Sequence, residues 1–186
     1  MEAQARSEAA ENAARERAEA WQEICPPLYR DTDATRLKSV PLEEVLNWMP
    51  GPKGIALAGM TGAGKTRAMF LLMHRLHMEG HYVTAITAKR FERYIHQMFE
   101  KDNDAREMIR RAHRAEILFI DDIGKEKYTE RVESEFYDLI ETRAANMRPI
   151  IWTTNTNGAG LAMMMSPDQG EPILRRLREF TKIITV

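Results

Sequence analysis

A glycine-rich run that ends in lysine and threonine has the most distinctive chemistry in this sequence. Residues 59–66 read Gly-Met-Thr-Gly-Ala-Gly-Lys-Thr, which is the spacing of a phosphate-binding loop. Glycines let such a loop turn tightly, so that its N–H groups and the start of the next helix face phosphate oxygens. The lysine can reach the β- and γ-phosphates, and the threonine hydroxyl is an oxygen ligand for Mg²⁺. The run therefore predicts a nucleoside triphosphate site with Mg²⁺.

We expect the whole loop and the residue after it to contact the nucleotide. These residues are Gly59, Met60, Thr61, Gly62, Ala63, Gly64, Lys65, Thr66 and Arg67. Lys65 is expected to act on phosphate during catalysis, and Thr66 to ligate Mg²⁺. The alternative is a glycine-rich turn without a ligand. The apolar run before the loop and the helical pattern after it favour the phosphate-binding interpretation.

Two carboxylates follow an apolar run farther along the chain. Residues 117–122 read Ile-Leu-Phe-Ile-Asp-Asp, which places Asp121 and Asp122 at the carboxyl end of a buried strand. Ligands of open α/β sheets bind at that edge. We assign Asp121 to the metal and Asp122 to the general base that polarises the attacking water. The alternative is a polar loop start or a helix cap.

A third polar group follows the next apolar strand, in the run Trp152-Thr153-Thr154-Asn155. An amide at that point can orient the attacking water and respond to the γ-phosphate, so Asn155 is a candidate catalytic residue. Asparagine also favours turns, which is the alternative.

These side chains need a sheet to bring them together, and the rest of the chain predicts one. Short apolar runs alternate with longer helical patterns, which indicates a parallel sheet with helices on both faces. Strands are expected near 55–58, 82–87, 117–120, 150–154 and 182–186. Helices are expected near 64–79, 88–100, 103–114 and 130–146, with short helical pieces at 42–48, 161–165 and 173–178.

The chain divides into three parts. Residues 1–23 contain eight alanines and six glutamates without glycine or proline, which predicts an acidic helix that Pro26 and Pro27 end. That helix is either a solvated appendage or a docking element for a partner. Residues 24–53 form a lead-in segment, and residues 54–186 form the ATPase core.

Composition excludes several other classes. With 186 residues, a net charge of −1 and one cysteine, Cys25, the chain is a single domain without a disulfide framework. It has no apolar run of the ~18 residues that a membrane span needs and no signal peptide, so we expect a cytoplasmic protein. His74, His77 and His81 form no convincing metal-ligand set, and Met163, Met164 and Met165 are expected in the core.

Four motifs in order resemble a known family. They are GMTGAGKT, ILFIDDIG at 117–124, FYDLIETR at 136–143 and RPIIWTTN at 148–155. Together they resemble the AAA+ ATPases of the DnaC/IstB type, which include replicative helicase loaders and transposition helpers. The resemblance covers residues 24–186.

The resemblance implies a P-loop NTPase core of the ASCE class, with a five-stranded parallel sheet of order 5-1-4-3-2. Because the chain reaches its fifth strand at Val186, we expect no C-terminal lid domain. The resemblance also implies an oligomer with ATP at each subunit interface. Arg176 would act there as an arginine finger on the neighbour's γ-phosphate, with Arg175 as the alternative.

Eight basic and five acidic side chains lie between residues 88 and 114, interleaved with aromatics. Basic groups can follow a nucleic acid through its phosphates. The candidate DNA contacts are Lys89, Arg90, Arg110, Arg111 and Arg114. The aromatic residues of this region have helical spacing and fit a core-facing stripe better than base stacking.

The most concrete hypothesis is a slow Mg-ATPase that helps a replicative helicase onto single-stranded DNA, stimulated by oligomerisation or DNA. Two alternatives stay open: a transposition helper that acts on duplex DNA, and an adaptor that binds nucleotide with little turnover. A small-molecule kinase would need an acceptor pocket, of which the sequence shows no sign.

Overall fold

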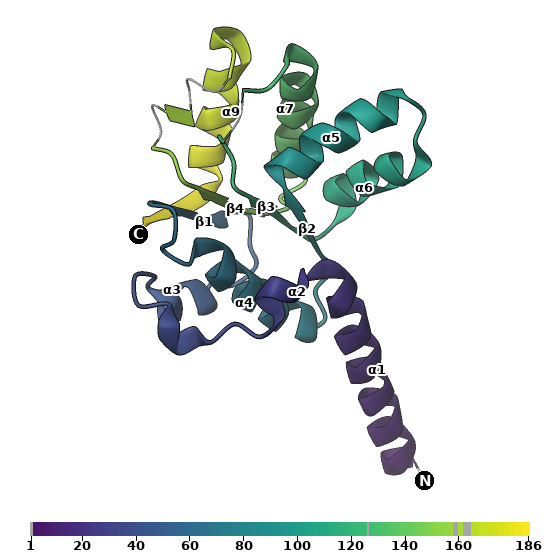
Figure 1. Ribbon diagram of the computed structural model, residues 1–186. Helices are drawn as coiled ribbons and strands as arrows, with labels where there is room; N and C mark the ends of the chain where they lie inside the picture. Colours follow the sequence, from purple (N-terminus) through teal and green to yellow (C-terminus); the bar gives the residue numbers. More distant parts are fainter. Residues whose placement is uncertain (1, 126, 158–159, 162–164) are drawn as a thin grey trace.

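A five-stranded parallel sheet forms the centre of the molecule, as the computed structural model shows (Figure 1). The structure describes residues 2–125, 127–157, 160–161 and 165–186. Its strands are β1 (Gly54–Ala58), β2 (Val83–Thr87), β3 (Ile117–Asp121), β4 (Ile150–Thr154) and β5 (Thr181–Thr185). They lie in the order β2-β3-β4-β1-β5. This is the order 5-1-4-3-2 counted from the other edge, so the predicted sheet is confirmed.

Helices cover both faces of the sheet (Figure 1). One face carries α2 (Pro27–Arg30), α3 (Leu42–Leu46) and α4 (Lys65–Met78). The end of α1 (Glu2–Ile24) and a 3₁₀ turn at Ala34–Arg36 lie on the same face. The other face carries α5 (Ala88–Phe99), α6 (Asn103–Arg114), α7 (Glu130–Ala145) and α9 (Pro167–Glu179). Within the described residues, no helix combines the length and apolar character that a bilayer span requires.

Alternate side chains along the strands belong to two hydrophobic cores, one on each face of the sheet. On β1, Ile55 and Leu57 pack with Met69 and Leu72 of α4, whereas Ala56 belongs to the cluster under α5, α6, α7 and α9. Successive side chains of a strand point to opposite faces, so a strand buried on both sides must be apolar throughout. This is why the run 117–120 has no polar residue.

The sheet order brings the candidate site together. Parallel pairing sets Ala58 of β1 beside Thr154 of β4, and Leu118 of β3 beside Ile150 of β4. The three strands therefore end at the same edge, where β1 leads into the loop 59–64, β3 ends on Asp121 and β4 leads to Asn155.

The C-terminal helical region differs from the expectation. Instead of a short piece at 173–178, α9 runs from Pro167 to Glu179 and contains Pro172. The buried carboxylate of Glu133, on α7, accepts hydrogen bonds from the backbone N–H and the hydroxyl of Ser166, directly before α9. That support from another element is invisible in the local sequence. Of the piece expected at 161–165, Met163 and Met164 lie outside the described residues, and Met165 is buried in the core as expected.

The end of α1 is fastened to α4, while its start extends away from the body (Figure 1). Trp21 is 5% exposed and its ring lies 6.4 Å from Phe70 and 5.7 Å from His77. His77 Nε2 also lies 2.8 Å from the carbonyl oxygen of Arg17. The predicted acidic helix is present, and its C-terminal turns are part of the fold.

Candidate nucleotide-binding site

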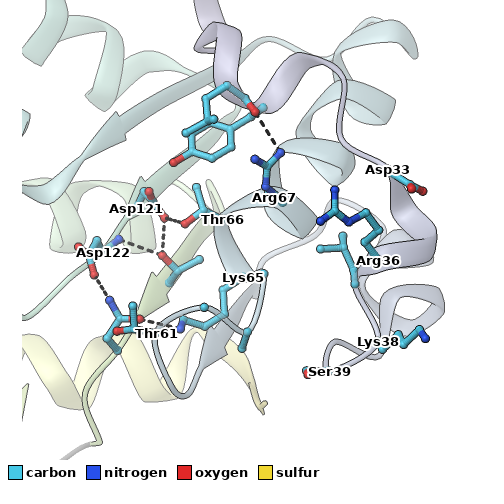
Figure 2. Close-up of a pocket in the computed structure, with 18 of the residues that line it drawn as sticks. Asp33, Arg36, Lys38, Ser39, Thr61, Lys65, Thr66, Arg67, Asp121 and Asp122 are labelled. Carbon is cyan, nitrogen blue, oxygen red and sulfur yellow. Dashed lines mark hydrogen bonds between the residues drawn. The ribbon is translucent and has the colours of Figure 1, made fainter.

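A pocket of about 780 Å³ opens at the carboxyl edge of the sheet (Figure 2). One side consists of the glycine-rich loop and the start of α4, together with the carboxylates that follow β3. The opposite side consists of residues from the lead-in segment, among them Asp33, Arg36, Lys38 and Ser39. The phosphate loop, the acidic pair and Asn155 thus line one cavity, although they are far apart in the sequence.

The loop has the backbone shape that phosphate binding requires. Gly62 and Gly64 have φ values of 88° and 90°, in the left-handed region that favours glycine. A Cβ on Gly64 would also lie 2.6 Å from Leu37 Cδ2, because the lead-in segment packs directly on this turn. Helix α4 begins at the next residue, Lys65, so its positive end faces the pocket.

Lys65 is held at the bottom of the loop. It is 5% exposed, and its Nζ donates to the carbonyl oxygens of Gly59 at 2.9 Å and Met60 at 2.8 Å. A third bond, of 2.7 Å, goes to Asn155 Oδ1. Burial lowers the pKa of Lys65, while the carboxylates of Asp122 and Asp121 act in the opposite direction. The ammonium is therefore preorganised beside the position a phosphate would take.

Two hydroxyls converge on Asp121. Its Oδ1 accepts from Thr66 Oγ1 at 2.8 Å and from Thr153 Oγ1 at 2.6 Å. The carboxyl group is 8% exposed, and this burial raises its pKa, against which the two hydroxyl donors act. A buried carboxylate next to a hydroxyl is the oxygen donor set that Mg²⁺ prefers. The residues present therefore fit a magnesium ion held by Thr66 and Asp121.

Asp122 directly follows Asp121 and has a strained backbone. Its φ of 62° is in the left-handed region, which aspartate tolerates better than most residues. The N–H of Asp122 donates to Thr153 Oγ1 at 2.9 Å. Oδ1 accepts from Asn155 Nδ2 at 2.5 Å, and Oδ2 lies 3.6 Å from Lys125 Nζ.

Asn155 connects the two charged parts of the site, because its amide bonds both Lys65 and Asp122. This position fits a residue that responds to phosphate. The structure thus brings together five of the predicted residues, from three strand ends: Lys65, Thr66, Asp121, Asp122 and Asn155.

Other loop residues differ in their placement. Thr61, Gly62 and Ala63 line the pocket, whereas the Met60 side chain is 80% exposed and is not among the lining residues. Arg67 lines the pocket but is bonded to the lead-in segment, not turned into the phosphate loop (Figure 2).

Arg176 lies away from this chain's own pocket. It bonds Glu141 of α7 and Glu179 of α9. It also lines a small cavity with Pro149 and Thr181, which mark the amino ends of β4 and β5. Arg176 is therefore at the edge of the sheet opposite to the nucleotide pocket. Arg175 is exposed on the same helix.

The five candidate DNA contacts are all exposed but fall into two groups. Lys89 and Arg90 begin α5, directly after the carboxyl end of β2, whereas Arg110, Arg111 and Arg114 end α6, directly before β3. Because β2 and β3 are parallel, the two groups lie at opposite edges of the sheet. A five-residue strand separates these edges by about 16 Å. The core-facing stripe predicted for α5 is confirmed for Phe91 and Ile95, which are buried, and in part for Tyr94, which is partly buried. It is wrong for Phe99, which ends α5 and is 49% exposed.

Two contributors were not identified from the sequence. Thr153 contacts both aspartates, yet only the pairing of β3 with β4 brings it there. The lead-in residues that line the pocket include charged side chains in no recognisable motif. The one signal for them was proximity in sequence to the phosphate loop.

Comparison with known proteins agrees with the fold and the pocket. The sequence model of the IstB-like ATP binding proteins matches residues 27–186. The chain is also 23% identical over 129 residues to the uncharacterised protein YdaV of Escherichia coli strain K12. That match covers 69% of this chain and 50% of YdaV, so the chain spans about half the length of this curated relative.

Solved structures of replication proteins share the fold. A DnaC helicase loader superposes with a TM-score of 0.66 at 20% identity, over 90% of this chain and 98% of the loader. A replication initiator DnaA bound to AMPPCP and single-stranded DNA superposes with a TM-score of 0.66 at 19% identity, over 87% of this chain and 50% of that one. At such identities the likeness concerns the fold alone.

Proposed function

The chain belongs to the family of IstB-like ATP-binding proteins, and from that premise we propose that it binds Mg-ATP and hydrolyses it slowly. The observation that carries the proposal is the convergence of Lys65, Thr66, Asp121, Asp122 and Asn155 on one pocket. Three donors and two carboxylates of this kind suit the transfer of a γ-phosphoryl group to water.

Each side chain has a distinct part in this proposal. Lys65 and the N–H groups at the start of α4 would neutralise the β- and γ-phosphates. Thr66 and Asp121 would hold Mg²⁺, which supplies charge neutralisation to the phosphate oxygens when bound. The Asp122 carboxylate would accept the proton of the attacking water, and Asn155 would orient that water.

Nucleotide binding would also rearrange hydrogen bonds within the pocket. Lys65 Nζ now bonds Asn155 and two loop carbonyls, and a phosphate would compete for the same ammonium. If the Lys65 ammonium bonds a phosphate instead, Asn155 Oδ1 loses its hydrogen bond from Lys65. The Asn155 amide could then reorient and change its hydrogen bond to Asp122. The Lys65–Asn155–Asp122 chain therefore couples phosphate binding to the general base.

The cellular role we propose is help in placing a replicative helicase on single-stranded DNA. The fold shared with a DnaC helicase loader supports it, and Lys89 and Arg90 are exposed candidate DNA contacts at the same edge of the sheet as the pocket. We also propose self-association with ATP between subunits, since Arg176 lies too far from this chain's own pocket to act there. We also propose the division of the chain into the acidic helix 1–23, whose last turns pack on α4, the lead-in segment 24–53 and the ATPase core 54–186.

Release of phosphate from Mg-ATP by the purified chain tests the enzymatic part. We expect slow turnover that rises with protein concentration and with added single-stranded DNA. Lys65→Ala should abolish binding of ATP, and Asp122→Ala should abolish hydrolysis while binding persists. Hydrolysis by Asp122→Ala at the parent rate would contradict the role of Asp122.

An adaptor that binds ATP with almost no turnover is a second candidate, and the geometry of Asp122 favours it. The aspartate side chain is short, and both of its oxygens are engaged, by Asn155 and by Lys125. Stable ATP binding with no phosphate release above background, with and without DNA, would establish this candidate.

Binding assays with single-stranded and duplex DNA, in ATP and in ADP, test the DNA part. Preference for duplex would favour a transposition helper over a helicase loader. A pull-down with a replicative helicase, in ATP and in ADP, tests the partner directly. If no helicase is captured with either nucleotide, the loading role is contradicted.

A further inference from the structure

Half of the nucleotide pocket is formed by residues outside the phosphate-binding machinery. The side that faces the loop is lined by Pro27, Leu28, Tyr29, Asp31, Asp33, Arg36, Leu37, Lys38 and Ser39. The acidic pair lies on one side of Lys65 (Figure 2), and the amide of Asn155 bonds both Lys65 and Asp122. Asp33, Arg36, Lys38 and Ser39 lie on the other side (Figure 2). A nucleotide with its γ-phosphate at Asp121 must therefore direct its nucleoside to the lead-in segment.

Arg67 joins this segment to the phosphate-binding helix. It is the residue directly after Thr66, and its Nη1 donates to the carbonyl oxygen of Leu28 at 3.0 Å and to Thr32 Oγ1 at 3.3 Å. Its guanidinium also lies 5.6 Å from the centre of the Tyr29 ring. A planar, permanently charged group with several donors suits this combination of contacts.

The same segment is held by packing. The ring of Tyr29 stacks on Phe70 of α4 at 4.9 Å with 12° between the planes. Leu37 and Val40 are buried against the turn at Gly64. This part of the lead-in segment thus packs against the first two turns of α4, and Arg67 donates hydrogen bonds to residues 28 and 32 of it.

We propose that Arg67 is a positioning residue that sets the nucleoside half of the pocket by holding residues 28–32 in place. This inference rests on the proposed function, because it assumes that the pocket takes a nucleotide. It assigns Arg67 a different part from the one its place beside the loop predicts, since it would act on the nucleoside through the lead-in segment and not on phosphate.

Calorimetric titration with three ligands, each with Mg²⁺, separates the two roles: ATP, ADP and inorganic tripolyphosphate. Arg67→Ala should weaken ATP and ADP about tenfold, the loss expected from roughly one strong hydrogen bond, and leave tripolyphosphate unchanged. Arg67→Lys should restore part of the affinity, because lysine keeps one donor and the charge but loses the planar fork.

Arg75→Ala is the matched control. Arg75 is also on α4 and also donates to a lead-in carbonyl, that of Trp48 at 2.5 Å, but neither residue lines the pocket. The Arg75→Ala variant should bind ATP, ADP and tripolyphosphate as the parent does.

The outcomes distinguish this inference from the proposed function. Equal weakening of all three ligands by Arg67→Ala, or no weakening of any, overturns the role of Arg67. Failure of the parent chain to bind any of the three overturns the proposed function itself. A loss for ATP and ADP in Arg75→Ala as large as in Arg67→Ala overturns the assignment to Arg67 in particular.

Discussion

At the scale of single residues, the metal-ligand role proposed for Asp121 conflicts with the stability of the folded chain. Burial raises its pKa above the ordinary value, so the ionised form is disfavoured in the folded chain. A group with a raised folded pKa contributes stability below its unfolded pKa and loses that contribution as the pH rises through the folded value. At neutral pH the charged carboxylate therefore opposes folding when no cation is bound.

We predict that Asp121→Asn stabilises the chain without nucleotide or Mg²⁺. The amide oxygen can still accept from Thr66 and Thr153, but carries no buried charge. The melting temperature at pH 7.5 should rise by about 2–4 °C, the effect of roughly 1 kcal/mol in a chain of this size. The difference should shrink as the pH is lowered toward the raised pKa of Asp121, and calorimetry at several pH values measures it.

Asp122→Asn serves as the control for that experiment, since its carboxyl group is more exposed and no comparable stabilisation is expected. A lower melting temperature for Asp121→Asn at neutral pH would show that neighbouring groups of the folded chain compensate the charge of Asp121.

Thr153 gives a second prediction at this scale. Its hydroxyl donates to Asp121 and accepts from the N–H of Asp122, so Thr153→Val leaves both aspartates without that partner. Groups that orient a metal ligand typically change activity by 10–100-fold, and we expect a loss of roughly that size in ATP hydrolysis. ATP binding measured in EDTA should be unchanged, and Thr153→Ser should restore the rate. An unchanged rate in Thr153→Val would contradict this role.

Sequence reasoning identified residues whose chemistry depends on local spacing and missed those that depend on pairing. Lys65 and Thr66 are found because a phosphate loop needs them in fixed positions along the chain. Thr153 was not identified, and Arg67 was assigned to the nucleotide itself, because their contacts exist only once β4 lies beside β3 and the lead-in segment lies on α4.

At the scale of elements, Arg143 joins three parts of the fold. It is fully buried on α7, and its guanidinium donates to the carbonyl oxygens of Ala112 at 2.7 Å, Ala115 at 2.9 Å and Pro149 at 2.8 Å. These carbonyls lie at the end of α6 and directly before β3 and β4. Burial lowers the pKa of Arg143 to about 9, so the side chain is still charged at neutral pH.

We predict that Arg143→Met destabilises the chain by about 3 kcal/mol, because it leaves several buried carbonyls without a donor. Urea unfolding followed by circular dichroism measures the change. Arg175→Met, on the exposed side of α9, should stay within about 0.5 kcal/mol of the parent. Equal midpoints for the two variants would contradict a structural role for Arg143.

The elements also show why local patterns define some boundaries better than others. The five strands and the helices α4 to α7 lie within a residue or two of their predicted positions, because a buried strand must be apolar and an amphipathic helix keeps its period. The length of α9 depends on Glu133, 33 residues before Ser166, which holds the start of the helix. Contacts over such a distance leave no local pattern.

At the scale of the whole molecule, the two edges of the sheet have different parts in the proposed assembly. The carboxyl edge carries the nucleotide pocket, and the amino edge carries Arg176, bonded to Glu141. For Arg176 to reach a γ-phosphate, the amino edge of one copy must approach the carboxyl edge of the next. Contacts of this head-to-tail kind form rings or filaments, not closed pairs.

Mixing two inactive variants tests this arrangement. Lys65→Ala removes the pocket's phosphate ligand but keeps Arg176, whereas Arg176→Ala keeps the pocket but removes the arginine that it would present to a neighbour. Neither variant should hydrolyse ATP alone, and a mixture should, because a pocket of the second variant then lies beside an intact Arg176 of the first. The regained rate should follow the fraction of mixed interfaces as the ratio is varied.

Arg175→Ala in place of Arg176→Ala decides between the two arginines. Arg175 is already exposed, whereas Arg176 would have to leave Glu141 before it could reach a neighbour's phosphate. If Arg176 is nevertheless the arginine used, the Arg175→Ala variant alone should hydrolyse ATP at the parent rate. Full activity of Arg176→Ala alone would remove it from the site. Loss of activity in every mixture, with assembly intact by light scattering, would contradict a shared site between copies.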